Sequence, residues 1–154
     1  MKNKMIAFIA LLSVIIAGVM YYSFNRDNRH FSCLTQYHVH NDGVRANILM
    51  RFHFDESSGF VMLNGEYINE AGHHKVLSRK VLFDFQVNKD KYLLTSKAII
   101  PAAFDETDER ALSRLIDGFY IKVNQPAQYA IYHNGSGDYI FMNGNHPVLV
   151  CAKS

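Results

Sequence analysis

The sequence predicts an N-terminal transmembrane helix followed by a mainly β domain of the α+β class, built as a curved antiparallel sheet or small barrel of about eight strands. Three observations support this fold. They are an uncharged apolar run at Met5–Phe24, a series of short stretches rich in β-branched and aromatic residues, and one stretch of helical periodicity at about residues 105–118. They divide the chain into a short start (1–4), an anchor (5–24), a tether (25–30) and a β-rich domain (31–154).

The run Met5–Phe24 has the length of a membrane span. At about 1.5 Å per residue, a helix of this length covers roughly 30 Å, the thickness of a bilayer's hydrocarbon core. A cleaved signal peptide would have an apolar run of about 7–15 residues ending in small residues. Here Ala17 and Gly18 are followed by bulky side chains, which favours an uncleaved anchor. The side chains expected to anchor the chain in the membrane are Met5, Ile6, Phe8, Leu11, Leu12, Ile15, Ile16, Val19, Tyr21 and Tyr22.

The charges that flank this run are balanced. Lys2 and Lys4 precede it, and Arg26 and Arg29 follow it. The α-amine favours an N-terminus in the cytoplasm, and a long following domain is translocated largely regardless of nearby charge. We therefore expect a single-pass protein of the bacterial inner membrane with its C-terminal domain in the periplasm.

Two cysteines, Cys33 and Cys151, lie near the two ends of the β-rich domain. In an oxidising compartment such as the periplasm they would form a disulfide that joins the first strand to the last. In the chain-entropy model, closing a loop of this size stabilises the fold by roughly 5 kcal/mol. The alternative is two unrelated buried thiols in a cytoplasmic domain. Neither cysteine has a partner at C-x-x-C spacing, so redox catalysis is not expected.

The β-rich domain is divided into strands by turn signals. Val44–Phe54 alternates apolar and polar residues, as a strand with one buried face does, and Gly65 indicates a bulge or bend within another strand. Closing so many strands into a barrel or half-barrel would remove exposed edges, and the disulfide would place the first and last strands side by side. The expected strands are residues 31–40, 44–54, 59–69, 75–87, 92–100, 119–124, 129–134, 138–143 and 148–152.

One helix is expected at about residues 105–118. Asp105 or Thr107 would cap it and Gly118 would end it. Apolar residues recur at helical spacing at Leu112, Leu115, Ile116 and Phe119. Of these, Leu112, Leu115 and Ile116 would pack on the sheet or plug one end of it.

The residue types of this domain argue against several functions. Residues 30–154 carry 12 Lys and Arg against 13 Asp and Glu without a basic run, so nucleic-acid binding is not expected. Ser78 and Ser96 lack a nucleophile-elbow context, and the glycines form no phosphate loop. We therefore expect no catalytic residues, no cofactor and no enzyme activity.

Histidines and aromatic residues are the remaining candidates for a site. His38, His40 and His53 could bind zinc together, but no acid or cysteine completes a known ligand spacing, so a metal site is not expected. The domain also contains many Phe and Tyr residues. These predict either a solid barrel core or a barrel that holds a small apolar ligand.

The order of these features resembles the FidL-like membrane proteins of enteric bacteria. The features are a short basic start, one anchor, Cys33 just after it, the stretch L-S-R-K-V-x-F at Leu77–Phe83, and Cys151 near the C-terminus. The resemblance extends over essentially the whole chain, although its motifs are of low specificity. Proteins of that family tend to be encoded beside membrane-anchored winged-helix regulators of the ToxR type, an arrangement similar to the ToxS-type and VtrC-type periplasmic partners, some of which bind bile salts.

The resemblance implies an accessory protein whose periplasmic domain binds and stabilises or modulates a membrane-anchored ToxR-like transcription regulator. An alternative is a periplasmic binding module for a small amphipathic ligand such as a bile salt. A third is an envelope protein with a structural role. The resemblance carries no catalytic residues over to this chain.

Overall fold

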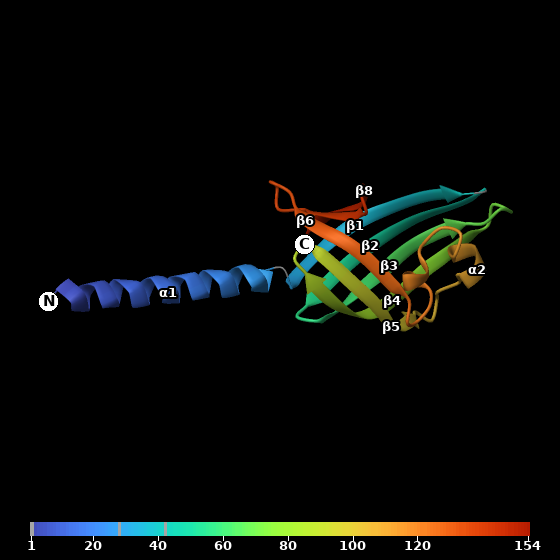
Figure 1. Cartoon of the computed structure of the whole chain (residues 1–154). Coiled ribbons are helices and arrows are strands. Elements are labelled where there is room, and N and C mark those ends of the chain that lie inside the picture. Colours follow the sequence, from blue (N-terminus) through green and yellow to red (C-terminus); the bar gives the residue numbers. More distant parts are fainter. Residues whose placement is uncertain (1, 28, 42) are drawn as a thin grey trace.

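The computed structural model describes the backbone of residues 2–27, 29–41 and 43–154, and the side chains of residues 9–21, 29–41 and 43–154. An N-terminal helix leads into an antiparallel barrel that is interrupted once by short helical turns (Figure 1). In chain order the elements are α1 (Lys2–Asp27), β1 (His30–Asn41), β2 (Val44–Asp55), β3 (Ser58–Ile68), β4 (His74–Asn88), β5 (Lys91–Pro101), α2 (Glu109–Leu112), the 3₁₀ turn η1 (Gly118–Tyr120), β6 (Pro126–His133), β7 (Tyr139–Asn143) and β8 (His146–Lys153).

The eight strands form a closed barrel in which each strand pairs with the next along the chain and β8 returns to β1. This confirms the predicted antiparallel order, and of the predicted alternatives (a curved sheet, a half-barrel or a barrel) the closed barrel is present. The alternation in the sequence explains the inner face, because every second residue of β2 from Val44 to Phe54 is buried. A strand of period two can bury only one face, so the other face of β2 points outward.

Aromatic side chains fill the barrel at the end where β1 begins. Phe31 stacks between Phe54 and Tyr139, with ring-centroid separations of 4.4 and 4.2 Å. Phe52 and Phe141 are fully buried beside them, with ring centroids 5.2 Å apart. Burying one side chain of this size contributes roughly 1.5–3 kcal/mol. Of the two predicted alternatives, the solid core is therefore present in this part of the barrel.

The sequence predicts a bulge or bend at Gly65. The structure instead shows two strands that approach each other closely there, without a bulge. Gly65 lies opposite both Ile48 and Leu77 in an unbroken register. A Cβ at this position would lie 2.0 Å from the backbone oxygen of Asn47. Glycine thus permits β2 and β3 to approach where a side chain would collide.

The predicted helix at 105–118 is wrong in length. Only Glu109–Leu112 forms an α-helical turn, and its N-cap is Asp108, whose side chain accepts a hydrogen bond from the Arg110 N–H. Asp105 is not a cap, because its carboxylate pairs with Arg79 of β4 inside the barrel end, with Nε and Oδ2 3.0 Å apart. The apolar residues expected on the helix, Leu112, Leu115, Ile116 and Phe119, are nevertheless buried. This segment covers the barrel end opposite α1 (Figure 1).

The prediction of a strand at residues 119–124 is also wrong. The Asp117 carboxylate accepts a hydrogen bond from the Phe119 N–H and caps the 3₁₀ turn Gly118–Tyr120. Phe119 and Tyr120 are buried from this turn, so their burial does not require strand geometry.

The helix α1 extends away from the barrel (Figure 1), and its large apolar side chains at residues 9–21 are exposed. They are Ile9, Leu11, Leu12, Val14, Ile15, Ile16, Val19, Met20 and Tyr21. Within the described part of the chain, no helix combines the length and the apolarity needed to cross a membrane. Four residues of the predicted anchor, Met5, Ile6, Phe8 and Tyr22, have side chains outside the described residues.

Candidate binding cleft

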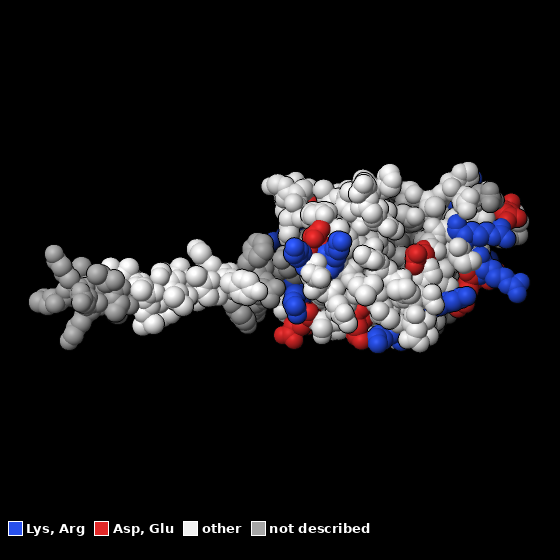
Figure 2. Space-filling model, viewed as in Figure 1, with Lys and Arg blue, Asp and Glu red and all other residues white. Residues whose placement is uncertain are grey.

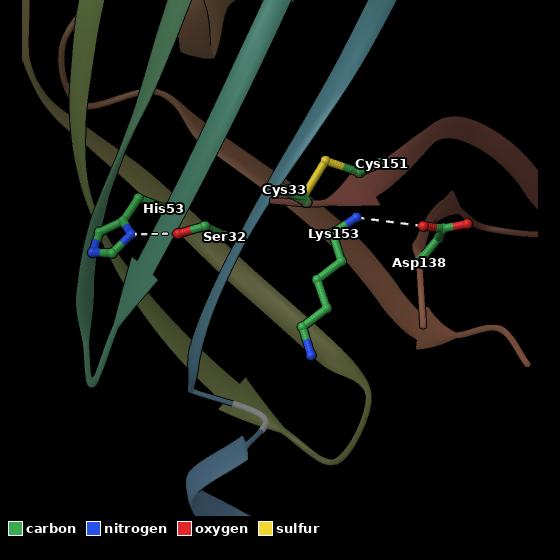
Figure 3. Close-up of a disulfide and its surroundings, with 6 residues drawn as sticks. All are labelled: Ser32, Cys33, His53, Asp138, Cys151 and Lys153. Carbon is green, nitrogen blue, oxygen red and sulfur yellow. Dashed lines mark hydrogen bonds between the residues drawn. A yellow bond between two sulfur atoms is a disulfide. The ribbon is translucent and has the colours of Figure 1, made fainter. Parts of the chain in front are cut away.

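The strands that close the barrel, β1 and β8, are joined over a short distance. Among the described residues they pair only at Cys33–Lys153 and Leu34–Ala152. The disulfide between Cys33 and Cys151 lies at this point, with the two Cα atoms 5.3 Å apart (Figure 3). This confirms the predicted disulfide and the predicted contact between first and last strands. Beyond this point, the paired part of the β1–β8 seam ends while both strands continue.

The continuing strands present unpaired backbone edges. The Ser32 carbonyl accepts a hydrogen bond from the Ser154 N–H at 3.2 Å, so Ser32 directs its backbone groups towards β8. Alternate residues of a strand direct their N–H and C=O groups to the same side. Gln36 and His38 of β1 therefore direct theirs into the open part of the seam. By the same alternation from Ala152, Val150 of β8 does so from the opposite edge.

A cleft of about 160 Å³ lies at the open part of the seam. Its apolar walls include Met50 of β2, Ile116 from the α2–η1 segment and Leu149 of β8, all buried. Half-buried Tyr37 of β1 contributes an aromatic wall. The exposed polar side chains that line it are Asp117 and Asn143. The barrel is thus solid at one end and hollowed near the other.

Two buried tyrosines form the polar part of the cleft. The hydroxyls of Tyr120 and Tyr129 are 3.1 Å apart and share a hydrogen bond, in which either oxygen can be the donor. Burial raises the pKa of Tyr120 well above its ordinary value and also raises the pKa of Tyr129. The negative charge of Asp117 acts in the same direction on both phenols. Both phenols are therefore neutral and protonated over the physiological pH range.

The three histidines considered for zinc are not brought together. His38 faces Asn47 in the β1–β2 register, and His53 faces Ser32 nearer the start of β1. The Ser32 hydroxyl and His53 Nδ1 are 2.6 Å apart and form a hydrogen bond (Figure 3). No group of three or more metal-ligating side chains occurs among the residues that the structure describes.

Ser78 and Ser96, which lack a nucleophile-elbow context in the sequence, both form hydrogen bonds within the barrel domain. The Ser78 hydroxyl donates to Asn64 Oδ1 at 2.9 Å, and the Ser96 hydroxyl donates to the Lys122 carbonyl at 2.7 Å.

On the barrel face shown in Figure 2, basic and acidic side chains are interspersed without a broad patch of one sign.

The cleft residues were not identified from the sequence. Tyr37, Tyr120 and Tyr129 occur in three separate segments, and nothing in their spacing indicates that they meet. Tyr120 was expected in a strand, whereas the 3₁₀ turn places its hydroxyl against Tyr129 of β6. The sequence signal available was the abundance of aromatic residues, which does not specify position.

Comparison with known proteins relates nearly the whole barrel to one family. A sequence model of the YqeJ C-terminal domain matches residues 30–151. The uncharacterized protein YqeJ of Escherichia coli (strain K12) is 25% identical over 155 residues, which cover 99% of this chain and 97% of that protein. No solved structure matches the chain. These matches give no support to the expected FidL-like relationship.

Proposed function

We propose, starting from the fact that this chain belongs to the YqeJ C-terminal domain family, that its barrel is a non-catalytic docking domain. In this proposal, the helix α1 holds the barrel at a membrane, and the open part of the β1–β8 seam receives an extended segment of a partner protein. The observation that carries the proposal is that, among the described residues, β1 beyond Leu34 and β8 before Ala152 have no strand partner at the seam next to the Cys33–Cys151 disulfide.

Unpaired strand edges are a recognised route for binding peptides. An added strand forms backbone hydrogen bonds with the edge, and its side chains supply specificity. Natural barrels normally leave no such edge, because exposed N–H and C=O groups promote unwanted pairing. Here the edge at Gln36 and His38 faces β8, on which Val148 and Val150 are 40% and 60% exposed. An extended segment entering the seam would satisfy the backbone groups and cover these valines.

The proposed membrane attachment is supported by the surface of α1. Large apolar side chains are exposed along residues 9–21, and this stretch carries no charged residue (Figure 2). A helix that is apolar on all sides is normally buried in a membrane or in a protein core. The span proposed from the sequence is Met5–Phe24, which reaches beyond the side chains that the structure describes, and the barrel would lie in the periplasm, where a disulfide is stable. A membrane shared with the partner raises their effective concentration, so a weak contact suffices.

The proposed partner is a membrane-anchored transcription regulator of the ToxR type. Its choice rests on the sequence features that resemble FidL-like proteins, and the partner's contribution would be an extended periplasmic segment. The barrel would stabilise or modulate the regulator by pairing with that segment.

Site-specific photo-crosslinking in membranes tests this function. A photoreactive residue is placed at Gln36 or Val150 on the open edges, or at Met62 as the control, in a full chain co-expressed with a membrane-anchored regulator of the ToxR type. Met62 is 39% exposed on β3, between two paired neighbours. Cross-links to the regulator from Gln36 and Val150, with none from Met62, support the proposal. Co-purification of the regulator without cross-links from either edge would show that it docks elsewhere, and no recovery of the regulator would exclude this partner.

A further inference from the structure

We propose that the cleft between Tyr37, Tyr120 and Tyr129 binds a small neutral molecule of about the size of one ring that carries a hydrogen-bond acceptor. This goes beyond the docking function, because the ligand occupies the interior of the barrel rather than its strand edges. The inference rests on the size of the cleft, the hydrogen-bonding state of its two buried phenols and its charge.

The size of the cleft restricts the ligand. Its volume is about 160 Å³. An apolar cavity of about 150 Å³ holds one benzene molecule, whereas sites for drug-sized ligands are about 300–1,000 Å³. A rigid four-ring bile salt is therefore too large to be enclosed here. The buried walls at Met50, Ile116 and Leu149 suit the apolar part of a smaller ligand, and the flexible thioether of Met50 can adapt to its shape.

The tyrosine pair indicates that the ligand carries a hydrogen-bond acceptor. Two phenols carry two O–H hydrogens, and the bond between Tyr120 and Tyr129 uses only one of them. The structure gives neither hydroxyl another acceptor among the described residues. Tyr120 is 4% exposed and Tyr129 is 7% exposed, so both side chains are largely removed from bulk water. A ligand carbonyl or ether oxygen placed in the cleft would accept it.

The charge of the cleft disfavours anions. Its described lining contains no Lys, Arg or His, and Asp117 contributes a carboxylate. That carboxylate already caps the Phe119 N–H at 2.8 Å. An anionic ligand would approach a negative charge with no cation to compensate it, whereas a neutral ligand avoids this repulsion.

Methyl NMR of the full chain in lipid nanodiscs, with its disulfide intact and its methionine methyl groups labelled, tests the proposal. Met50 reports on the cleft, and exposed Met62 on β3 reports nonspecific binding. The probes are acetophenone, which has a ring and an acceptor, ethylbenzene, which lacks the acceptor, and benzoate, which is anionic. We expect acetophenone to shift the Met50 signal saturably and to leave Met62 unchanged. Ethylbenzene should bind about three- to tenfold more weakly, the range of one neutral hydrogen bond, and benzoate should produce no shift.

The double substitution Tyr120→Phe with Tyr129→Phe is the matched variant, since it keeps both rings and removes both hydroxyls. It should abolish the preference for acetophenone over ethylbenzene while both still shift Met50. The proposal is overturned if no neutral probe shifts Met50 saturably, if Met62 shifts equally, or if benzoate binds as well as acetophenone. If the double variant fails to fold, the three probes on the unsubstituted chain still decide between these outcomes.

Discussion

Cys33 and Cys151 are covalently joined at the point where β1 and β8 stop pairing, so the disulfide closes the barrel at one end of an otherwise open seam. The sequence separation of 118 residues makes it a long loop closure. The covalent link therefore lies beside the short paired part of the seam, which spans Cys33–Lys153 and Leu34–Ala152.

Removing the disulfide should destabilise the barrel and loosen the seam. For Cys33→Ser with Cys151→Ser we expect a loss of about 2–5 kcal/mol in the free energy of unfolding, measured by urea denaturation. Hydrogen exchange should accelerate first at the Leu34 and Ala152 amides, which lie in the paired part of the seam. Unchanged protection there would contradict the view that the disulfide holds this end closed.

A proline at the open edge should block docking and leave the fold intact. The N–H of His38 points into the open seam, so His38→Pro removes no β1–β2 hydrogen bond. The control is Val39→Pro, which removes a ladder N–H and should cost about 1–3 kcal/mol. We expect His38→Pro to retain its unfolding midpoint and to lose the Gln36 cross-link to the regulator. Retention of that cross-link would argue against strand addition at β1.

The buried ion pair between Arg79 and Asp105 should be sensitive to loss of one partner. Their side chains are 5% and 2% exposed, and Arg79 and Thr107 both donate hydrogen bonds to the Asp105 carboxylate. Arg79→Met leaves a buried carboxylate unpaired, so we expect a loss of about 3–5 kcal/mol by urea denaturation. The double variant Arg79→Met with Asp105→Leu should recover most of the unfolding free energy that Arg79→Met loses. A double variant as unstable as the single one would show that the pair itself is required.

Acid should weaken this same contact. Burial alone would raise the pKa of Asp105, but the hydrogen bonds from Arg79 and Thr107 outweigh it and hold the pKa below its ordinary value. The stabilisation is therefore complete above the unfolded pKa of about 3.9 and is lost as the pH falls through it towards the folded value. We expect the unfolding free energy to decline less steeply below about pH 4 in Asp105→Asn than in the parent. If the unfolding free energies of Asp105→Asn and the parent declined equally steeply over that pH range, the assignment of this pH dependence to Asp105 would be refuted.

Gly65→Ala should destabilise the barrel because the new Cβ would lie 2.0 Å from the Asn47 backbone oxygen. The strands must move apart to relieve this overlap. We therefore expect the substitution to lower the free energy of unfolding by about 1–3 kcal/mol, measured by thermal or urea unfolding. Gly135→Ala is the matched control, since no atom lies within 4 Å of its added Cβ. Equal stability of the two variants would mean that β2 and β3 separate there without strain.

Much of the barrel could be predicted from local pattern. The alternation in Val44–Phe54 corresponds to the buried and exposed faces of β2, and eight of the nine expected strands are present. The predicted helix is longer than the observed one because Asp105 has the residue type of a cap, but a distant arginine on β4 binds it instead. The stretch 119–124 has β-forming residues, yet Asp117 caps a 3₁₀ turn there.

The order of the strands, the helical N-terminal stretch and the two cysteines positioned to pair could be predicted from local pattern, because they depend on residue type and on spacing along the chain. Three features are apparent only in the folded chain: Arg79 binds Asp105, the described part of the β1–β8 seam is unpaired beyond Leu34, and the hydroxyls of Tyr120 and Tyr129 meet in a cleft. Each of these depends on the distance between residues remote in sequence. That distance follows from barrel closure and strand register, which no local pattern specifies.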